Sequence, residues 1–179
     1  MGGSILTAHL ELVALTARFV RAVQAADRAM AGAEIGARVG TWMTADPSHI
    51  VQLYLAAQAA EAEGFPGLGR AIVLSTRREA RRLIGSIGFH GPPDELGRLE
   101  ASCRIHPAHQ SRGYAAEAYA ALLDWATERH GVDRFVIAIA WRFGRREPVP
   151  VDVAAVDVES ATGLVGAMAH LLEPKQTKR

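Results

Sequence analysis

Cysteine is almost absent from this chain of 179 residues, which contains only Cys103. A single cysteine excludes an internal disulfide framework and a cysteine-based metal site. No apolar run approaches the roughly 20 residues that span a bilayer, and the N-terminus lacks the basic and apolar regions of a signal peptide. An excess of one charge is also missing, since 20 Lys and Arg stand against 19 Asp and Glu. We therefore expect a cytoplasmic protein, monomeric or homodimeric, with no metal and with neither a membrane nor a nucleic acid as partner.

The composition that remains is typical of a globular protein. Hydrophobic residues make up 49% and charged residues 22% of the chain, and both fractions are ordinary. A chain of this length can bury a substantial core without disulfides. We therefore predict a single domain over 1–179.

Hydrophobic spacing predicts the first elements of the chain. A loose alternation predicts a strand over 5–15. Thr16 is placed to cap a helix after it. The apolar positions of that helix recur at helical spacing and are Phe19, Val20, Val23, Ala26 and Met30.

A second helix is predicted over 49–63, with Asp46 or Ser48 as its cap and Gly64 as its end. Runs rich in apolar residues then predict three strands. These strands cover 69–76, 81–91 and 97–105.

The last of these runs alternates between two sets of side chains. The apolar set is Leu99, Ala101, Cys103 and Ile105, and the polar set is Glu100, Ser102 and Arg104. Because successive side chains of a strand point to opposite faces, the pattern predicts a strand with two different environments. Cys103 belongs to the apolar set and has no evident activating partner, so we expect a packed cysteine rather than a nucleophile.

A helix that ends at Gly131 is predicted next. Its apolar stripe consists of Ala115, Ala118, Tyr119, Leu122, Leu123 and Ala126. The apolar run 134–140 then predicts a strand buried on both faces. A strand, a glycine-bearing loop, a helix and a further strand within about 40 residues indicate a βαβ unit with parallel strands.

The junction before this helix, Gln110-Ser111-Arg112-Gly113-Tyr114-Ala115, contains more than a helix cap requires. The first N–H groups of a helix have no internal partner and lie at the positive end of its dipole, so they can hold a phosphate. Gly113 permits a close backbone approach, Arg112 adds positive charge, and Ala115 leaves room for a bulky anion. The pattern fits a pyrophosphate, and the alternative is a glycine-containing turn with a solvated arginine.

Residues 85–140 resemble the GNAT acyl-CoA-dependent N-acetyltransferases, most closely the branch of the ribosomal-protein N-terminal (alanine/serine) acetyltransferases. The family signature Gln/Arg-x-x-Gly-x-Gly/Ala is matched by Gln110, Gly113 and Ala115, and Pro107 follows the strand as the family pattern expects. Residues 9–30 also resemble the first strand and helix of that branch.

This resemblance implies an α/β (α+β) fold, with a mixed twisted sheet and helices on both faces. The strands at 97–105 and 134–140 would splay apart to admit the pantetheine arm of acetyl-CoA. Backbone amides of Arg104, Ile105 and His106 would orient the pantetheine and thioester, and amides from Ser111 to Ala116 would hold the pyrophosphate. The implied coenzyme-binding residues are Arg104, Ile105, His106, Gln110, Ser111, Arg112, Gly113, Tyr114, Ala115 and Ala116.

The chemistry implied is direct attack of a neutral amine on the thioester, without a covalent enzyme intermediate. The expected catalytic residue is Glu100, which occupies the matching glutamate position and would remove the amine proton directly or through a water. The alternative is a solvated carboxylate paired with Arg98 or Arg104. His106 and His109 flank the turn and could line the acceptor site, although exposed loop histidines are common.

The resemblance ends after Ala140. The family pattern continues with an asparagine and with a helix that often carries a tyrosine able to protonate the departing thiolate. This sequence has no asparagine, and its tyrosines all lie earlier, at Tyr54, Tyr114 and Tyr119. The divergent segment 141–179 predicts a strand over 149–158 and a helix from Ser160 to about 172, and the C-terminal strands of the family sheet stay unassigned.

Two functions therefore remain open. The first is an N-acetyltransferase that moves an acetyl group from acetyl-CoA to a protein N-terminal α-amine or a small-molecule amine. The second is a catalytically degenerate member of the family that binds coenzyme A or a protein partner without transfer. The loop at 110–115 favours the first, and the C-terminal departure favours the second.

Overall fold

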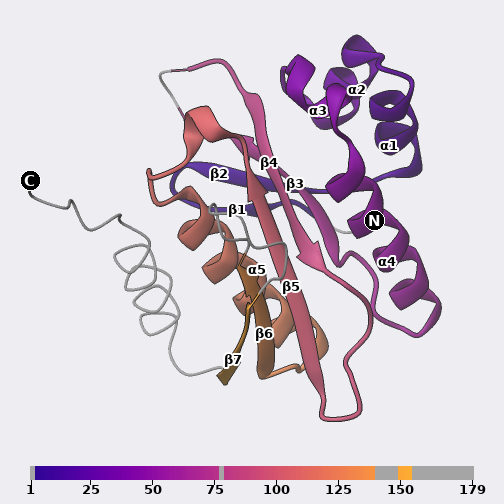
Figure 1. Ribbon diagram of the computed structural model, residues 1–179, viewed down its shortest axis with the longest axis vertical. Helices are drawn as coiled ribbons and strands as arrows, with labels where there is room; N and C mark the ends of the chain where they lie inside the picture. Colours follow the sequence, from indigo (N-terminus) through magenta and orange to yellow (C-terminus); the bar gives the residue numbers. More distant parts are fainter. Residues whose placement is uncertain (1–2, 77–78, 140–148, 155–179) are drawn as a thin grey trace, which may run out of the picture.

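The computed structural model describes residues 3–76, 79–139 and 149–154. Its centre is a seven-stranded sheet in which each strand lies beside its neighbours in the sequence, in the order β1-β2-β3-β4-β5-β6-β7 (Figure 1). Every neighbouring pair is antiparallel except β5 and β6, which are parallel. This mixed sheet, with helices on both faces, confirms the predicted α/β fold.

The strands are β1 Ile5–Leu6, β2 Leu10–Ala14, β3 Gly69–Leu74, β4 Arg82–Phe89, β5 Arg98–Ile105, β6 Arg134–Ile139 and β7 Val149–Ala154. The helices are α1 Ala17–Gln24, α2 Arg28–Ile35, α3 Thr41–Ala45, α4 Ser48–Ala62 and α5 Tyr114–His130. A short 3-10 turn, Pro107–His109, lies between β5 and α5.

Two hydrophobic clusters hold the helices on the two faces of the sheet. Alternate residues of β3 supply both: Ile72 packs in the cluster shared with α5, and Val73 packs in the cluster shared with α1. The α5 cluster also includes Tyr119 and Leu122, and the α1 cluster includes Phe19. Because each face of the sheet is apolar, each must be covered, and the sheet becomes the middle layer of three.

The single strand predicted over 5–15 is wrong, because the chain turns back within it. β1 and β2 form a short antiparallel pair, with Ile5 opposite Leu12. The Thr7 N–H donates to the Leu10 carbonyl over 2.9 Å, and the Leu10 N–H donates to the Thr7 hydroxyl oxygen over 2.9 Å. These two local hydrogen bonds close a turn in the middle of the alternating pattern.

The helix predicted after Thr16 is also shorter than its apolar spacing suggested. Thr16 caps α1 as predicted, since its side chain accepts from the Phe19 N–H over 3.1 Å. The helix then ends, Ala26 adopts a φ of 57°, and the Asp27 side chain caps α2 by accepting from the Met30 N–H. Neither Ala26 nor Met30 is in the core, and Met30 is 39% exposed. A local capping side chain therefore outweighed a weak continuation of the hydrophobic stripe.

The remaining predicted elements are confirmed within one to a few residues. α4 matches the helix predicted over 49–63. The predicted cap at Asp46 or Ser48 is wrong, because the N-cap is Pro47 and no side chain caps the helix, although Asp46 accepts from the Ser48 N–H beside its start. β3, β4 and β5 match the three predicted strands, and Gly131 ends α5 in the left-handed conformation. α2 and α3 were not predicted.

The predicted βαβ unit is present as β5, α5 and β6, with β5 and β6 parallel. The strand predicted over 149–158 is present as β7, which pairs antiparallel with β6. The helix predicted from Ser160 to about 172 lies outside the described residues.

Gly88 in β4 is expected to tolerate no side chain. An added Cβ would lie 2.7 Å from the Leu68 carbonyl oxygen and 2.9 Å from the Gly69 Cα, both in the neighbouring backbone. Gly88→Ala should therefore lower the free energy of unfolding by about 1–3 kcal/mol, measured by urea denaturation. Gly3→Ala is the matched control, since a Cβ there meets nothing within 4 Å. Equal stability of the two variants would contradict the prediction.

Candidate active site

The parallel strands β5 and β6 separate part of the way along β5. Their register runs from Arg98 opposite Arg134 to Ser102 opposite Ala138. β5 continues for three more residues to Ile105 while it remains paired with β4 on its other side. Within the described residues, the last three residues of β5 therefore have one free edge, at the point where the resemblance places the opening for the pantetheine arm.

The backbone N–H groups near this opening differ in whether they face β4 or the free edge of β5. The His106 N–H donates to the Ile84 carbonyl over 2.8 Å, so it is already used within the sheet. Alternate residues of an antiparallel strand direct their N–H groups to the same side, and this places the Arg104 N–H toward β4 as well. The Ile105 N–H points the other way, toward the free edge. Of the residues 104–106 expected to orient a pantetheine, only Ile105 has an amide without an acceptor in the part of the chain that the structure describes.

The loop between β5 and α5 has the backbone form of an anion site. Ser111 and Gly113 both adopt positive φ, 59° and 79°. No side chain caps α5, and within the described residues the backbone N–H groups from Ser111 to Ala116 have no backbone acceptor. Consecutive N–H groups of this kind, at a helix N-terminus, form a concave site for an anion. A Cβ at Gly113 would meet nothing within 4 Å, so the space in front of the loop is open.

Two sets of side-chain contacts hold this loop in place. The Gln110 amide donates to the Ile105 carbonyl over 2.8 Å and closes the turn onto β5. At the start of α5, Glu117 accepts from the Thr7 hydroxyl over 2.5 Å and from the His9 N–H over 2.8 Å. Burial opposes ionisation of Glu117, but these hydrogen bonds outweigh it and lower its pKa. The β1–β2 turn therefore anchors the helix end that carries the candidate anion site.

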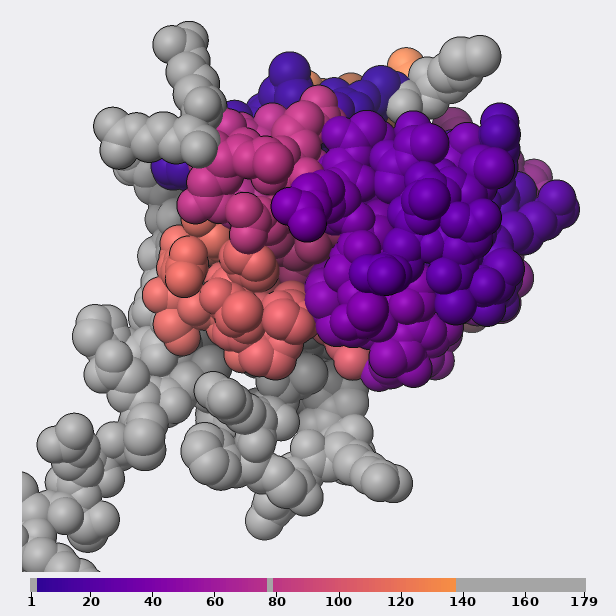
Figure 2. All heavy atoms as spheres, turned by 90° about the horizontal axis from the view of Figure 1, so that it is seen from above, coloured from indigo at the N-terminus to yellow at the C-terminus, as the bar shows by residue number. Residues whose placement is uncertain are grey.

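The loop also lies close to the helices on the other side of the sheet. Figure 2 shows the segment after β5 beside the surface formed by α2 to α4 and beside the turn before β4. The His106 ring packs at 4.8 Å from the Trp42 ring of α3, between ring centroids. His109 lies 6.1 Å from His106, and burial lowers its pKa with a further contribution from Arg112. His106 and Trp42 thus join the loop before α5 to the α3 region.

Glu100 is exposed on the polar face of β5, as its position in the sequence predicted. The ion pairs expected as the alternative role are not formed. Arg98 pairs with Asp94 at 2.8 Å, and Arg104 pairs with Asp46 at 2.6 Å. Within the described residues no cation is paired with the Glu100 carboxylate, so it is free to accept a proton.

The Arg104–Asp46 pair connects β5 to the start of α4. The hydrogen bond from Arg104, with those from Ser48, lowers the pKa of Asp46 to about 2. The side chain of Arg104 is therefore engaged on the α4 side of the sheet rather than beside the loop. Because the Arg104 N–H points toward β4, neither its side chain nor its N–H faces the edge of β5 expected to take the pantetheine.

Cys103 is a packed residue, as predicted. It lies against the α5 cluster, and burial raises the pKa of its thiol to about 12. The Tyr119 side chain forms a hydrogen bond with the Cys103 backbone. A thiol in this environment is a poor nucleophile.

A series of hydrogen-bonded polar side chains beside Glu100 was not predicted, and its members are Ser86, His49, Ser102 and His90. The His49 ring, in the first turn of α4, lies 2.7 Å from the Ser86 hydroxyl through Nδ1 and 2.9 Å from the Ser102 hydroxyl through Nε2. The Ser102 hydroxyl is also 2.7 Å from His90 Nε2. Burial, with a smaller effect of His90, lowers the pKa of His49 to about 4. The available signals were a serine inside the apolar β4 and the polar set of β5.

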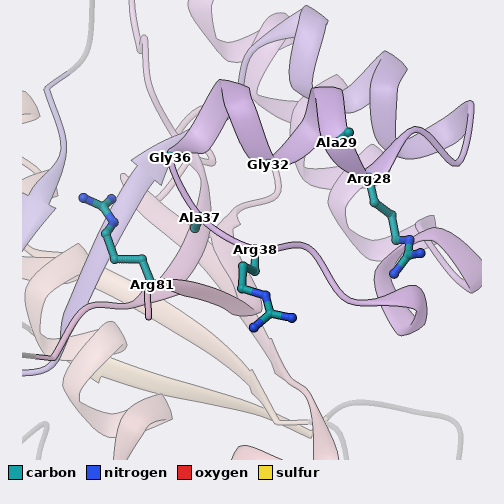
Figure 3. A pocket seen from close by; sticks show the side chains of 7 residues that line it. All are labelled: Arg28, Ala29, Gly32, Gly36, Ala37, Arg38 and Arg81. Atoms are coloured by element: carbon teal, nitrogen blue, oxygen red, sulfur yellow. The ribbon is translucent and has the colours of Figure 1, made fainter. Parts of the chain in front are cut away.

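An open pocket of about 490 Å³ lies under α2, apart from these residues. Arg28 and Arg38 point toward the same side of it, whereas the Arg81 guanidinium points away and pairs with Glu11 (Figure 3). The small residues that complete its lining are Ala29, Gly32, Gly36 and Ala37. None of the predicted site residues lines this pocket.

Within residues 3–76, 79–139 and 149–154, no helix is both long and apolar enough to cross a membrane. No group of three or more His, Cys, Asp or Glu side chains there is gathered as a metal would require.

Comparison with known proteins identifies the family. Residues 16–142 match the model of the acetyltransferase (GNAT) domain. This match covers well over half of the chain, so the protein belongs to the GNAT acetyltransferase family. The family predicted from residues 85–140 is confirmed, and the match ends close to Ala140, where the resemblance also ends.

Individual solved structures share only a low sequence identity with this chain. A solved acetyltransferase from Agrobacterium tumefaciens strain C58 has 19% identity and a TM-score of 0.50, and the likeness covers 100% of this chain and 89% of that one. A solved acetyltransferase from Salmonella typhimurium, which modifies the N-terminal serine of ribosomal protein L7/L12, has 16% identity, a TM-score of 0.46 and coverage of 75% and 74%.

One curated relative matches over a shorter segment. It is an uncharacterised N-acetyltransferase, YjdG, of Bacillus subtilis strain 168, and it is 34% identical over 58 residues. The matched segment is 32% of this chain and spans about a third, 34%, of the length of the relative.

Proposed function

We propose that the protein transfers an acetyl group from acetyl-CoA to a primary amine, by direct attack of the amine on the thioester. One observation carries this proposal. The backbone N–H groups from Ser111 to Ala116 have no backbone acceptor within the described residues, and they lie near the free edge of β5. The GNAT family match supports the same chemistry. The loop thus offers a binding site for a pyrophosphate, and the free strand edge offers one for an amide-containing arm.

Binding of the coenzyme is assigned to backbone more than to side chains. The pyrophosphate would lie against the amides from Ser111 to Ala116, where the helix dipole and the Arg112 guanidinium both favour negative charge. The open space at Gly113 lets the anion approach the backbone closely. The Ile105 N–H at the free edge would donate to a pantetheine carbonyl, and Gln110 keeps the loop closed.

Glu100 is proposed as the catalytic base. An amine acceptor is mostly protonated at neutral pH and cannot attack until it loses that proton. The carboxylate of Glu100 is exposed and has no ion-pair partner among the described residues, and it lies on the face of β5 that also carries Ser102. It would accept the proton directly or through a water. The polypeptide would otherwise act by positioning the amine and the thioester carbon.

The acceptor is proposed to be a protein N-terminal α-amine or a small-molecule amine. The edge of the site next to the loop is formed by His106 and Trp42, whose flat rings suit a flexible or apolar group beside the amine. Assignment to the ribosomal-protein branch rests on the sequence resemblance.

A second candidate function is coenzyme or partner binding without transfer. The observation that favours it is the departure from the family pattern after Ala140, with no asparagine in the chain and no tyrosine after Tyr119. The general acid that the pattern supplies in this part is therefore missing from the sequence.

Acetyl-CoA is expected to stabilise the protein against unfolding by about 2.7 kcal/mol at a hundredfold excess over its dissociation constant. The measurement is the melting temperature with and without acetyl-CoA, followed by mass spectrometry of a panel of amines and N-terminal peptides. Stabilisation with an acetylated product supports transfer, and stabilisation without any product supports the second candidate. An unchanged melting temperature in millimolar acetyl-CoA would reject both coenzyme-dependent functions.

A further inference from the structure

The chain of Ser86, His49, Ser102 and His90 crosses from the buried interior of the sheet to its surface. Ser86 is 1% exposed, His49 and Ser102 are half-buried, and His90 is exposed. Three side-chain contacts of 2.7, 2.9 and 2.7 Å join them in that order. A continuous series of hydrogen bonds with one end in solvent is the arrangement that moves a proton between an enclosed site and water.

This series of four side chains lies where the reacting amine would be. Ser102 is the last residue of β5 that pairs with β6, so its hydroxyl lies at the point where the two strands separate. It shares a face of β5 with Glu100, the proposed base, and Glu100 itself lies across from His90, whose N–H donates to the Glu100 carbonyl over 2.8 Å. An amine beside Glu100 and next to the strand opening would therefore be beside Ser102.

The need of each polar group for a hydrogen-bond partner decides which atom donates in each contact of this series. Ser86 is buried, and within the described residues its hydroxyl has no contact other than His49. Its proton is satisfied only if Ser86 donates to His49 Nδ1. His49 Nε2 then carries the ring proton and donates to the Ser102 oxygen, and the Ser102 hydroxyl donates to His90 Nε2. Burial keeps His49 uncharged, with a pKa of about 4, so its part in the chain is that of a fixed donor.

We infer that Ser102 passes a proton from the reacting amine to His90, and that His49 is a positioning residue that holds the Ser102 hydroxyl in the required direction. This inference rests on the proposed function. Glu100 takes the first proton, which converts the ammonium group to the amine. After the amine has attacked the thioester carbon, its nitrogen carries one proton too many.

Each proton in this second transfer is accounted for. The N–H bond of the attacking nitrogen breaks as a new O–H bond forms on Ser102, and the former Ser102 proton forms an N–H bond at His90 Nε2. His90 then releases a proton to water from its exposed ring. The C–S bond breaks with its electron pair on sulfur, and the departing thiolate takes a proton from solvent.

The test compares Ser102→Ala and Ser102→Thr with the parent, in the full chain with acetyl-CoA and an amine that the parent acetylates. We expect Ser102→Ala to lower kcat by about 10²-fold, with the dissociation constant of acetyl-CoA unchanged. Ser102→Thr keeps a hydroxyl and should recover most of the rate. Ser75→Ala, which removes a hydroxyl just after the end of β3, is the control and should keep the parent kcat.

His90→Gln supplies a readout that a structural role would not change. The double variant Ser102→Ala with His90→Gln should be no slower than the slower single variant, because both break the same chain.

Full activity of Ser102→Ala would overturn the relay while the proposed function stands. Additive losses in the double variant would also overturn it, since the two residues would then act separately. A parent that transfers to no tested amine would reject the proposed function and the relay with it. Unfolding free energies of all variants, measured in urea, separate a loss of rate from a loss of fold.

Discussion

Glu100→Gln is expected to lower turnover by about 10²- to 10⁴-fold, the range typical of a positioned general base, while acetyl-CoA binds with unchanged affinity. The reason is that Glu100 is exposed on β5 and has no ion-pair partner within the described ranges, while Arg98 and Arg104 pair with Asp94 and Asp46. Glutamine keeps the size and most of the hydrogen bonding of the side chain but cannot accept the proton. The loss should shrink as pH rises, because solution then supplies more of the free amine.

The measurement is kcat and KM for an accepted amine between neutral and alkaline pH. Glu128→Gln, on the exposed side of α5, is the matched control and should keep the parent rate. Equal activity of Glu100→Gln and the parent at neutral pH would reject the base assignment. If the parent binds acetyl-CoA and transfers to nothing, the missing asparagine and the missing late tyrosine become the explanation.

Gly113→Val is expected to weaken acetyl-CoA binding by about 10²-fold, because the branched side chain occupies the space through which a pyrophosphate reaches the loop amides. Loss of two hydrogen bonds to a charged group, at about 1.5 kcal/mol each, corresponds to a factor of this size. The fold should persist, since a Cβ at Gly113 meets no protein atom within 4 Å and the loop is exposed. Titration calorimetry of the variant with acetyl-CoA measures the effect.

Gly131→Val controls for backbone strain at the other end of the same helix. Gly131 has a φ of 67°, similar to the 79° of Gly113, and a Cβ there also meets nothing within 4 Å. Both valines should cost similar stability, because a β-branched residue is strained at positive φ. Only Gly113→Val should affect the coenzyme. Unchanged binding in that variant would make Gly113 a turn residue and nothing more.

Strong periodicity and local turn chemistry made much of the fold predictable. α5 carries a clear apolar stripe and ends at a left-handed glycine, so its position and its end could be predicted from its own residues. The alternation over β5 correctly separated Ala101 and Ile105 from Glu100 and Ser102. Prediction failed where short polar contacts interrupt a pattern, as Thr7 does within 5–15 and Asp27 does before α2.

Some features of the candidate site likewise depend on residues near one another in the chain, and others depend on contacts between residues far apart in it. Gly113 and the loop amides could be found from the sequence, because a helix N-terminus with a glycine before it is a local feature. Glu100 could be named, but its freedom from Arg98 and Arg104 could not, since Asp46 is 58 residues from Arg104 in the chain. The hydrogen bond from the His106 N–H to the Ile84 carbonyl could not be predicted either, because it depends on the pairing of β4 with β5.

The sequence alone therefore determined the family, the βαβ unit and the loop that is proposed to bind a pyrophosphate, because each depends on residues near one another in the chain. Only the tertiary structure decided which polar groups on the sheet meet. His49 and Ser102 are 53 residues apart, and they come within 2.9 Å because α4 packs on β3 and β4, and β5 lies next to β4 in the sheet. A side chain's charge state and hydrogen-bond direction follow from such packing, since burial removes the water that would otherwise satisfy it.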